Sequence, residues 1–139
     1  MTRSPLRPLP LFLVAACALA AFSGCGTTRS AIRAENNTGI SKLEKGMKKE
    51  DAVKLMGTGV KHTLTRPIEN PYRTETFKNG EKTYEILYYY TDEVGWNAAI
   101  IEESLTPLVF ENGVLIGWGR DWLDARYRLF KYGYRPPAA

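Results

Sequence analysis

The dipeptide Asn-Gly occurs twice in this chain of 139 residues, each time between two runs rich in β-branched and aromatic residues. The first copy, Asn79-Gly80, lies within residues 74–91, and the second, Asn112-Gly113, lies within residues 107–120. Asparagine and glycine both tolerate the positive φ angles that a two-residue hairpin turn requires. The sequence therefore predicts two β-hairpins, which together supply four antiparallel strands.

The first predicted hairpin has one apolar face. A two-residue turn at Asn79-Gly80 predicts that Phe77 pairs with Lys82 across the two strands. Alternate residues of a strand point to the same side of a sheet. One face of this hairpin then carries four large side chains: Phe77, Tyr84, Ile86 and Tyr88.

The second predicted hairpin pairs Phe110 with Leu115 and Val109 with Ile116. One face then carries Leu108, Phe110, Leu115, Gly117 and Gly119. Because glycines on a strand let another element approach closely, we expect helices from residues 40–57 to cover this face and form the core.

The opposite face of the second hairpin is a candidate surface for a protein partner. Its residues are Val109, Val114, Ile116 and Trp118, and Arg120 follows directly after the strand. An apolar patch with a tryptophan and a nearby arginine has the composition of an interface hot spot. The alternative is that the C-terminal segment lays Trp122 and Leu129 over this face and buries it.

Two segments outside the hairpins have helical patterns. Residues 40–59 predict two short helical pieces separated at Gly46, the second with an apolar face and acidic residues in its first turn. Residues 121–132 also have a helical pattern. The predicted fold class is α+β, with short N-terminal helices packed on a four-stranded antiparallel sheet of two hairpins, plus a C-terminal helix.

The N-terminus has the order of residues that is typical of a secretory signal. Arg3 and Arg7 precede an apolar stretch at residues 11–22, and the first acidic residue is Glu35. The stretch is shorter than the roughly 20 apolar residues that span a bilayer. We expect a signal that is cleaved; an uncleaved membrane anchor is the alternative.

The end of this segment, Phe22-Ser23-Gly24-Cys25, resembles the lipobox of bacterial lipoproteins. The resemblance implies that residues 1–24 are a lipoprotein signal peptide and that Cys25 carries the lipid. It also implies an outer-membrane anchor facing the periplasm, since Gly26 stands where an aspartate commonly retains lipoproteins in the inner membrane. The alternative is an ordinary signal peptide with an unrelated cysteine. Residues 25–38 are small and polar, and predict a flexible tether.

Charge and cysteine content exclude several functions. Without Arg3 and Arg7 the mature chain has 17 basic and 15 acidic side chains, a balance that does not favour nucleic acid. Cys17 leaves with the signal and Cys25 takes lipid, so no thiol remains for a disulfide, a metal or catalysis. His62, the only histidine, has no cysteine to partner it. We expect neither an enzyme nor a cofactor.

The segment at residues 91–104 is a candidate ligand loop. It is long for a connection between strands, and such loops are often functional. Its carboxylates, Asp92, Glu93, Glu102 and Glu103, are weak candidates for a hard cation such as calcium. Their spacing does not match an EF-hand, so a solvated loop without metal is the favoured interpretation.

Two stretches carry a family resemblance. LEKGMKKEDAVKLMG at residues 43–57 is similar to the opening helix of the BamE-like (SmpA/OmlA-type) lipoproteins, and LTPLVFENGVLIGWG at residues 105–119 resembles small members of that group. The resemblance implies a BamE-like α+β domain at residues 39–135 that binds another envelope protein, with a role in outer-membrane assembly. The alternative is a periplasmic module that binds a small ligand or cation through residues 91–104.

Overall fold

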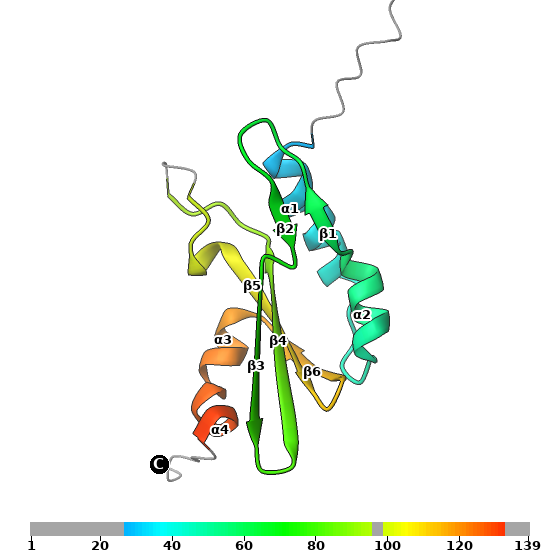
Figure 1. Cartoon of the computed structure of the whole chain (residues 1–139), viewed down its shortest axis with the longest axis vertical. Helices are drawn as coiled ribbons and strands as arrows, with labels where there is room; N and C mark the ends of the chain where they lie inside the picture. Colours follow the sequence, from blue (N-terminus) through cyan, green and yellow to red (C-terminus); the bar gives the residue numbers. More distant parts are fainter. Residues whose placement is uncertain (1–26, 96–98, 133–139) are drawn as a thin grey trace, which may run out of the picture.

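The computed structural model describes residues 27–95 and 99–132, and the predicted signal and Cys25 lie outside these ranges. Figure 1 shows the elements in chain order. They are α1 (Arg29–Ile40), α2 (Lys49–Met56), β1 (Gly59–Lys61), β2 (Ile68–Asn70), β3 (Arg73–Asn79), β4 (Lys82–Tyr90), the 3-10 helix η2 (Glu102–Ser104), β5 (Leu105–Glu111), β6 (Val114–Trp118), α3 (Arg120–Asp124) and α4 (Tyr127–Tyr132).

The main sheet has four antiparallel strands in the order β3-β4-β5-β6. Each outer pair is one of the hairpins that the Asn-Gly dipeptides predict, so the predicted α+β class and its two-hairpin sheet are confirmed. In the second hairpin Asn112 and Gly113 have φ angles of 49° and 79°, as the predicted tight turn requires.

The register of the first hairpin differs from the prediction. Asn79 pairs with Lys82, so the two turn residues are Gly80 and Glu81, and Phe77 faces Tyr84 rather than Lys82. The Asn79 side chain is engaged elsewhere, because its Nδ2 donates to the carbonyl of Leu129 at 3.2 Å. The shift is two residues, so the predicted apolar face is preserved.

The second hairpin contains a β-bulge that the sequence did not reveal. Phe110 pairs with Leu115 as predicted, but Val109 pairs with Gly117, which leaves Ile116 as an extra residue in β6. An extra residue reverses the alternation of the strand beyond it. Gly117 and Trp118 therefore point to the faces opposite to those predicted.

Helices cover both faces of the sheet (Figure 1). On the α2 face, Ala52 and Met56 pack with a set of sheet residues: Leu87, Tyr89, Leu108, Phe110 and Leu115. On the α3 face, Leu123 and Phe130 pack with another set: Tyr84, Ile86, Tyr88 and Val109. A Cβ on Gly117 would lie 2.2 Å from the Trp122 ring, so this glycine admits α3, and not the N-terminal helices as predicted.

Residues 29–38, predicted as part of a flexible tether, form most of helix α1. Thr28 caps the helix by accepting a hydrogen bond from the Ala31 N–H at 3.1 Å. Ile32, Asn36 and Gly39 share one buried face of the helix. Two of these three residues are polar or small, which is why the composition suggested a tether. The predicted domain boundary at residue 39 is therefore wrong, because α1 belongs to the fold.

The first helical piece predicted in residues 40–59, the one before Gly46, is not formed, although α2 matches the second. Ile40 is the last residue of α1, and residues 41–45 consist of turns and irregular chain. Residues 46–49 then run along the outer edge of β6, where the Gly46 N–H donates to the carbonyl of Leu115 and the Leu115 N–H to that of Met47, both at 2.8 Å. This segment thereby protects one edge of the sheet.

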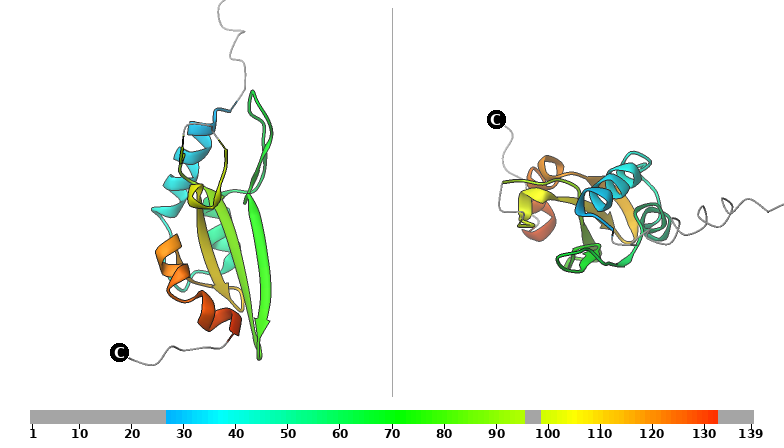
Figure 2. Two further views of the ribbon diagram at one scale, coloured as in Figure 1. Left: turned by 90° about the vertical axis from the view of Figure 1, so that its left-hand side faces the viewer. Right: turned by 90° about the horizontal axis from the view of Figure 1, so that it is seen from above.

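A small second sheet, β1 and β2, has no counterpart in the sequence prediction. Both strands have only three residues, which is too few for a clear alternating pattern. Their connecting loop lies at the same end of the long axis as the start of α1, and α4 lies at the opposite end (Figures 1 and 2). The predicted C-terminal helix is divided into α3 and α4, with Ala125 and Arg126 between them.

Candidate functional site: a charged pocket on the α3 face

A charged hollow lies where β3, β4, η2 and α3 meet. It has a volume of about 240 Å³. Its lining residues are Arg73, Glu75, Tyr88, Glu102, Arg120, Leu123, Asp124 and Tyr127. Two of them, Glu102 and Arg120, are residues that the sequence analysis singled out for different reasons.

Glu102 is the centre of this pocket because it accepts hydrogen bonds from two arginines. Arg73 Nη2 donates to Glu102 Oε2 at 3.0 Å, and a second bond joins Arg73 Nη1 to Oε1. Arg120 Nη2 donates to the same Oε2 at 3.1 Å and to the Glu102 backbone carbonyl at 2.6 Å. The two arginines thus tie η2 to β3 and to α3.

Tyr88 forms an aromatic wall of the pocket. The guanidinium carbon of Arg73 lies 4.1 Å from the centre of the Tyr88 ring, and that of Arg120 lies 5.8 Å from it. These distances are within the range of cation–π attraction. The ring therefore helps to hold both arginines above the strand.

The electrostatics of the pocket fix the protonation of its titratable groups. Partial burial opposes ionisation of Glu102, but hydrogen bonds and charges from Arg73 and Arg120 outweigh it and hold the pKa of Glu102 below its ordinary value. Burial, assisted by the charge of Glu75, raises the pKa of Tyr88 to about 12. Glu102 is therefore ionised and Tyr88 protonated near neutral pH.

The pocket's positive charges are neutralised within the pocket. Arg73 also forms an ion pair with Glu75 at 3.3 Å, so two guanidinium groups face the carboxylates of Glu75, Glu102 and Asp124. An anionic ligand would have to displace Glu102 from both arginines. These ion pairs hold the segment before β5 against the sheet and α3.

The four carboxylates predicted as weak cation ligands do not come together. Glu93 forms an ion pair with Arg33 of α1, and Asp92 accepts a hydrogen bond from the Glu93 N–H at 2.7 Å. Glu102 is held by its arginines, and Glu103 is exposed. No group of three or more His, Cys, Asp or Glu side chains in residues 27–95 and 99–132 could hold a metal ion. The predicted cation site in residues 91–104 is not formed by these side chains.

The residues predicted as a partner-binding patch are also separated. The bulge in β6 directs Trp118 to the α2 face, whereas Val109 is fully buried on the α3 face and Ile116 packs against that same core. Arg120 belongs to the charged pocket. The alternative, that the C-terminal segment covers one face, is correct for Trp122, which lies over Gly117; Leu129 is 39% exposed.

A buried cluster of amides, which was not predicted from the sequence, joins α1 to the sheets. Asn36 Nδ2 donates to the carbonyl of Tyr90 at 2.7 Å, and Asn36 Oδ1 accepts from Asn70 Nδ2 at 3.1 Å. Asn70 Nδ2 also lies 3.1 Å from the carbonyl of Met56, at the end of α2. The spacing of Ile32, Asn36 and Gly39, typical of one helix face, was the signal that could have revealed it.

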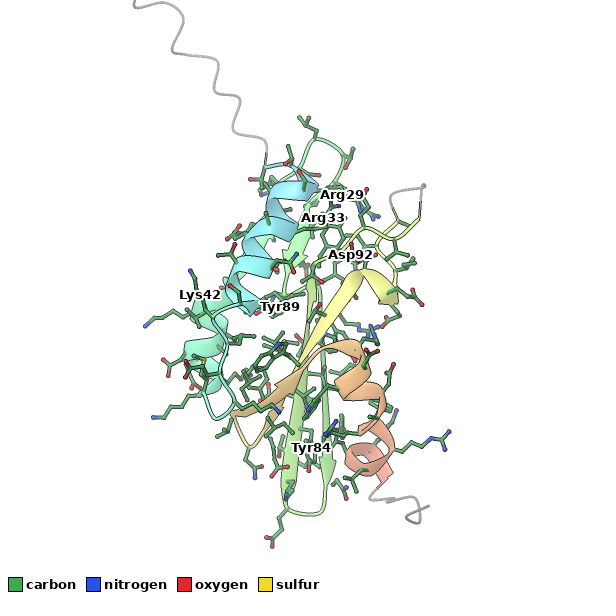
Figure 3. The ribbon with its side chains drawn as sticks, turned by 180° about the vertical axis from the view of Figure 1, so that it is seen from behind. Arg29, Arg33, Lys42, Tyr84, Tyr89 and Asp92 are labelled. Carbon is green, nitrogen blue, oxygen red and sulfur yellow. The ribbon has the colours of Figure 1, made fainter. Side chains whose placement is uncertain are left out.

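Arg33 and Tyr90 extend this joint towards the surface. Arg33 Nη1 donates to the Tyr90 hydroxyl at 3.1 Å and forms the ion pair with Glu93. Figure 3 shows Arg29 and Arg33 on α1 close to the segment that carries Asp92. Helix α1 is therefore fixed both to β4 and to the chain that follows it.

A family model described as "Protein of unknown function (DUF3192)" matches residues 28–125. The match covers well over half of the chain, and the chain therefore belongs to this family. The matched range begins one residue before α1, which agrees with α1 being part of the domain. No curated protein and no solved structure matches the chain. None of the helices within residues 27–95 and 99–132 is long and apolar enough to cross a membrane.

Proposed function

We propose that this protein is a lipid-anchored component of the bacterial cell envelope, held by Cys25 in the outer membrane and facing the periplasm. The observation that carries the proposal is the tetrapeptide Phe22-Ser23-Gly24-Cys25 at the end of an apolar segment preceded by arginines. The position of the domain supports it, because the capped start of α1 at Thr28 follows Cys25 after only two residues.

We further propose that the domain acts by binding another envelope protein rather than by catalysis. The positive charges of the pocket around Glu102 are neutralised by its own carboxylates, and the single histidine, His62, is exposed in the loop between β1 and β2. The arrangement of α1 and α2 with an antiparallel sheet fits what the resemblance to BamE-like lipoproteins implies. A role as an accessory in outer-membrane assembly is the specific form of this proposal.

The candidate surface for a partner is a group of apolar side chains beside α2. Met47 and Leu55, with Asp51 and Lys54, line a shallow hollow of about 460 Å³, and Leu55 is 39% exposed. Apolar side chains rimmed by charges are typical of the centre of a protein interface. This surface replaces the predicted patch around Trp118.

Photo-crosslinking in intact cells tests the binding role. A benzophenone amino acid in place of Leu55 should give a discrete adduct with one envelope protein. The matched control is the same amino acid in place of Leu129 in α4, which is equally exposed. Equal adducts from the two positions, or none from either, would contradict protein binding at the α2 surface.

A further inference from the structure

The loop between β1 and β2, residues 62–67, lies beside the start of α1 at the end of the molecule where the chain leads back to Cys25 (Figures 1 and 2). The two segments together line a hollow of about 220 Å³. Its residues are Thr27, Thr28 and Arg29 from the start of α1, and Thr63, Leu64 and Thr65 from the loop. This end of the domain therefore consists of two segments that are distant in sequence.

Leu64 is unusual among the apolar residues in the part of the chain that the structure describes. It is 93% exposed, whereas the other large exposed apolar residues there have exposures between 39% and 51%. The backbone around it is held by Thr63, whose hydroxyl donates to the Arg66 carbonyl at 2.6 Å and accepts from the Arg66 N–H at 3.2 Å. A leucine presented in this way at a loop tip gains by leaving water.

The covalent chain limits how far this end can lie from an anchor at Cys25. Three residue steps lead from Cys25 to Thr28, and an extended chain covers at most about 11 Å in that number of steps. Helix α1 is in turn joined to β4 and β2 through the buried amides of Asn36 and Asn70. Because α1 is fixed to the rest of the domain, the short segment after Cys25 would hold this end of the domain close to the membrane.

We propose that this end of the domain is a membrane-contact surface and that Leu64 inserts its side chain into the lipid layer. The inference rests on the proposed lipid at Cys25, which identifies the occupant as the bilayer in which that lipid is embedded. Arg66, two residues after the leucine, is exposed and suits the phosphates of the headgroups, as in other proteins that lie on a membrane surface. Arg29 lies over the Tyr90 ring instead, with its guanidinium carbon 5.4 Å from the ring centre. Lys61 is paired with Glu35 at 2.8 Å and adds no net charge.

Depth-dependent fluorescence quenching tests the orientation. The mature lipoprotein, purified from membranes, carries an environment-sensitive fluorophore on the thiol introduced by Leu64→Cys; the matched control is Leu129→Cys, at the opposite end. Both are reconstituted in vesicles of phosphatidylethanolamine and phosphatidylglycerol that contain acyl-chain nitroxide lipid. We expect blue-shifted emission and several-fold stronger quenching for the probe at position 64.

The intact mass of the same samples separates the two proposals. If the diacylglyceryl increment is present and both positions are quenched equally, the membrane orientation is wrong while the anchor stands. If the increment is missing, the anchor is wrong and the orientation is overturned with it.

Discussion

Two polar clusters connect separate elements of this domain, and they differ in charge and in exposure. The amide cluster of Asn36 and Asn70 is neutral and buried, with exposures of 0% and 3%. The ionic cluster of Arg73, Glu102 and Arg120 is charged and close to the surface, where the Glu102 side chain is 48% exposed. The first joins α1 to the two sheets, and the second joins η2 to β3 and α3.

The comparison shows where polar groups determine structure. Water does not reach a buried amide, so each lost hydrogen bond leaves a polar group unsatisfied and lowers the free energy of unfolding. Partly exposed ion pairs compete with water and salt, and contribute little. We therefore expect the amide cluster to be necessary for the packing of α1 on the sheets. We expect the ionic cluster to make only a small contribution, by holding the segment before β5 in place.

Asn36→Ala should have the largest effect on stability. It removes the buried hydrogen bonds that Asn36 makes with the Tyr90 carbonyl and with Asn70 Nδ2, and should lower the free energy of unfolding by about 2–3 kcal/mol. Asn37→Ala is the matched control, because Asn37 is exposed and bonds the Thr91 carbonyl at 2.8 Å. Both variants gain the same helix propensity. Equal losses in urea unfolding would contradict the contrast between buried and exposed amides.

Tyr89 offers a third situation, a buried polar group without a partner among the described residues. Its hydroxyl makes no hydrogen bond there, and burial raises its pKa to about 12 (Figure 3 labels the residue). Tyr89→Phe should therefore raise the free energy of unfolding by about 1 kcal/mol.

Tyr84→Phe is the control for that substitution, since the Tyr84 hydroxyl donates to Glu111 Oε2 at 2.9 Å. We expect it to lower the free energy of unfolding by about 1 kcal/mol. A loss of stability in Tyr89→Phe would show that its hydroxyl has a partner after all.

Glu102→Gln should have the smallest effect, below about 1 kcal/mol at low salt and smaller still at high salt. Because the pKa of Glu102 is lowered in the folded protein, its contribution is present above the ordinary glutamate pKa and is lost as pH falls through the lowered value. The difference in the free energy of unfolding between the wild type and Glu102→Gln should therefore become smaller as the pH falls through the lowered pKa of Glu102. A difference that is independent of pH in urea unfolding would contradict the role given to the two arginines.

The sequence predicted those features of the fold that depend on local chemistry. The Asn-Gly dipeptides predicted both hairpins and the residues of the second turn, although the first turn is displaced by one residue to Gly80 and Glu81, and the alternation in residues 82–90 identified the apolar face of β4. The bulge at Ile116 could not be predicted, because it depends on how β6 meets β5, and it reversed the faces of Gly117 and Trp118.

The polar clusters were harder to predict than the fold. Asn36 lies in a segment whose composition resembles a linker, and its buried partner Asn70 is 34 residues away. Arg73, Glu102 and Arg120 also come from three separate segments, and no short motif connects them. Contacts between distant residues depend on the packing of elements, which local patterns do not specify.

Metabolic labelling with radioactive palmitate is the most direct test of the lipid-anchor proposal. We predict that the wild type and the control Cys17→Ser, altered only within the signal, incorporate label, and that Cys25→Ser does not and accumulates as a precursor that retains residues 1–24. Label that persists in Cys25→Ser at the level of the wild type would contradict the proposal that Cys25 anchors this protein in the envelope.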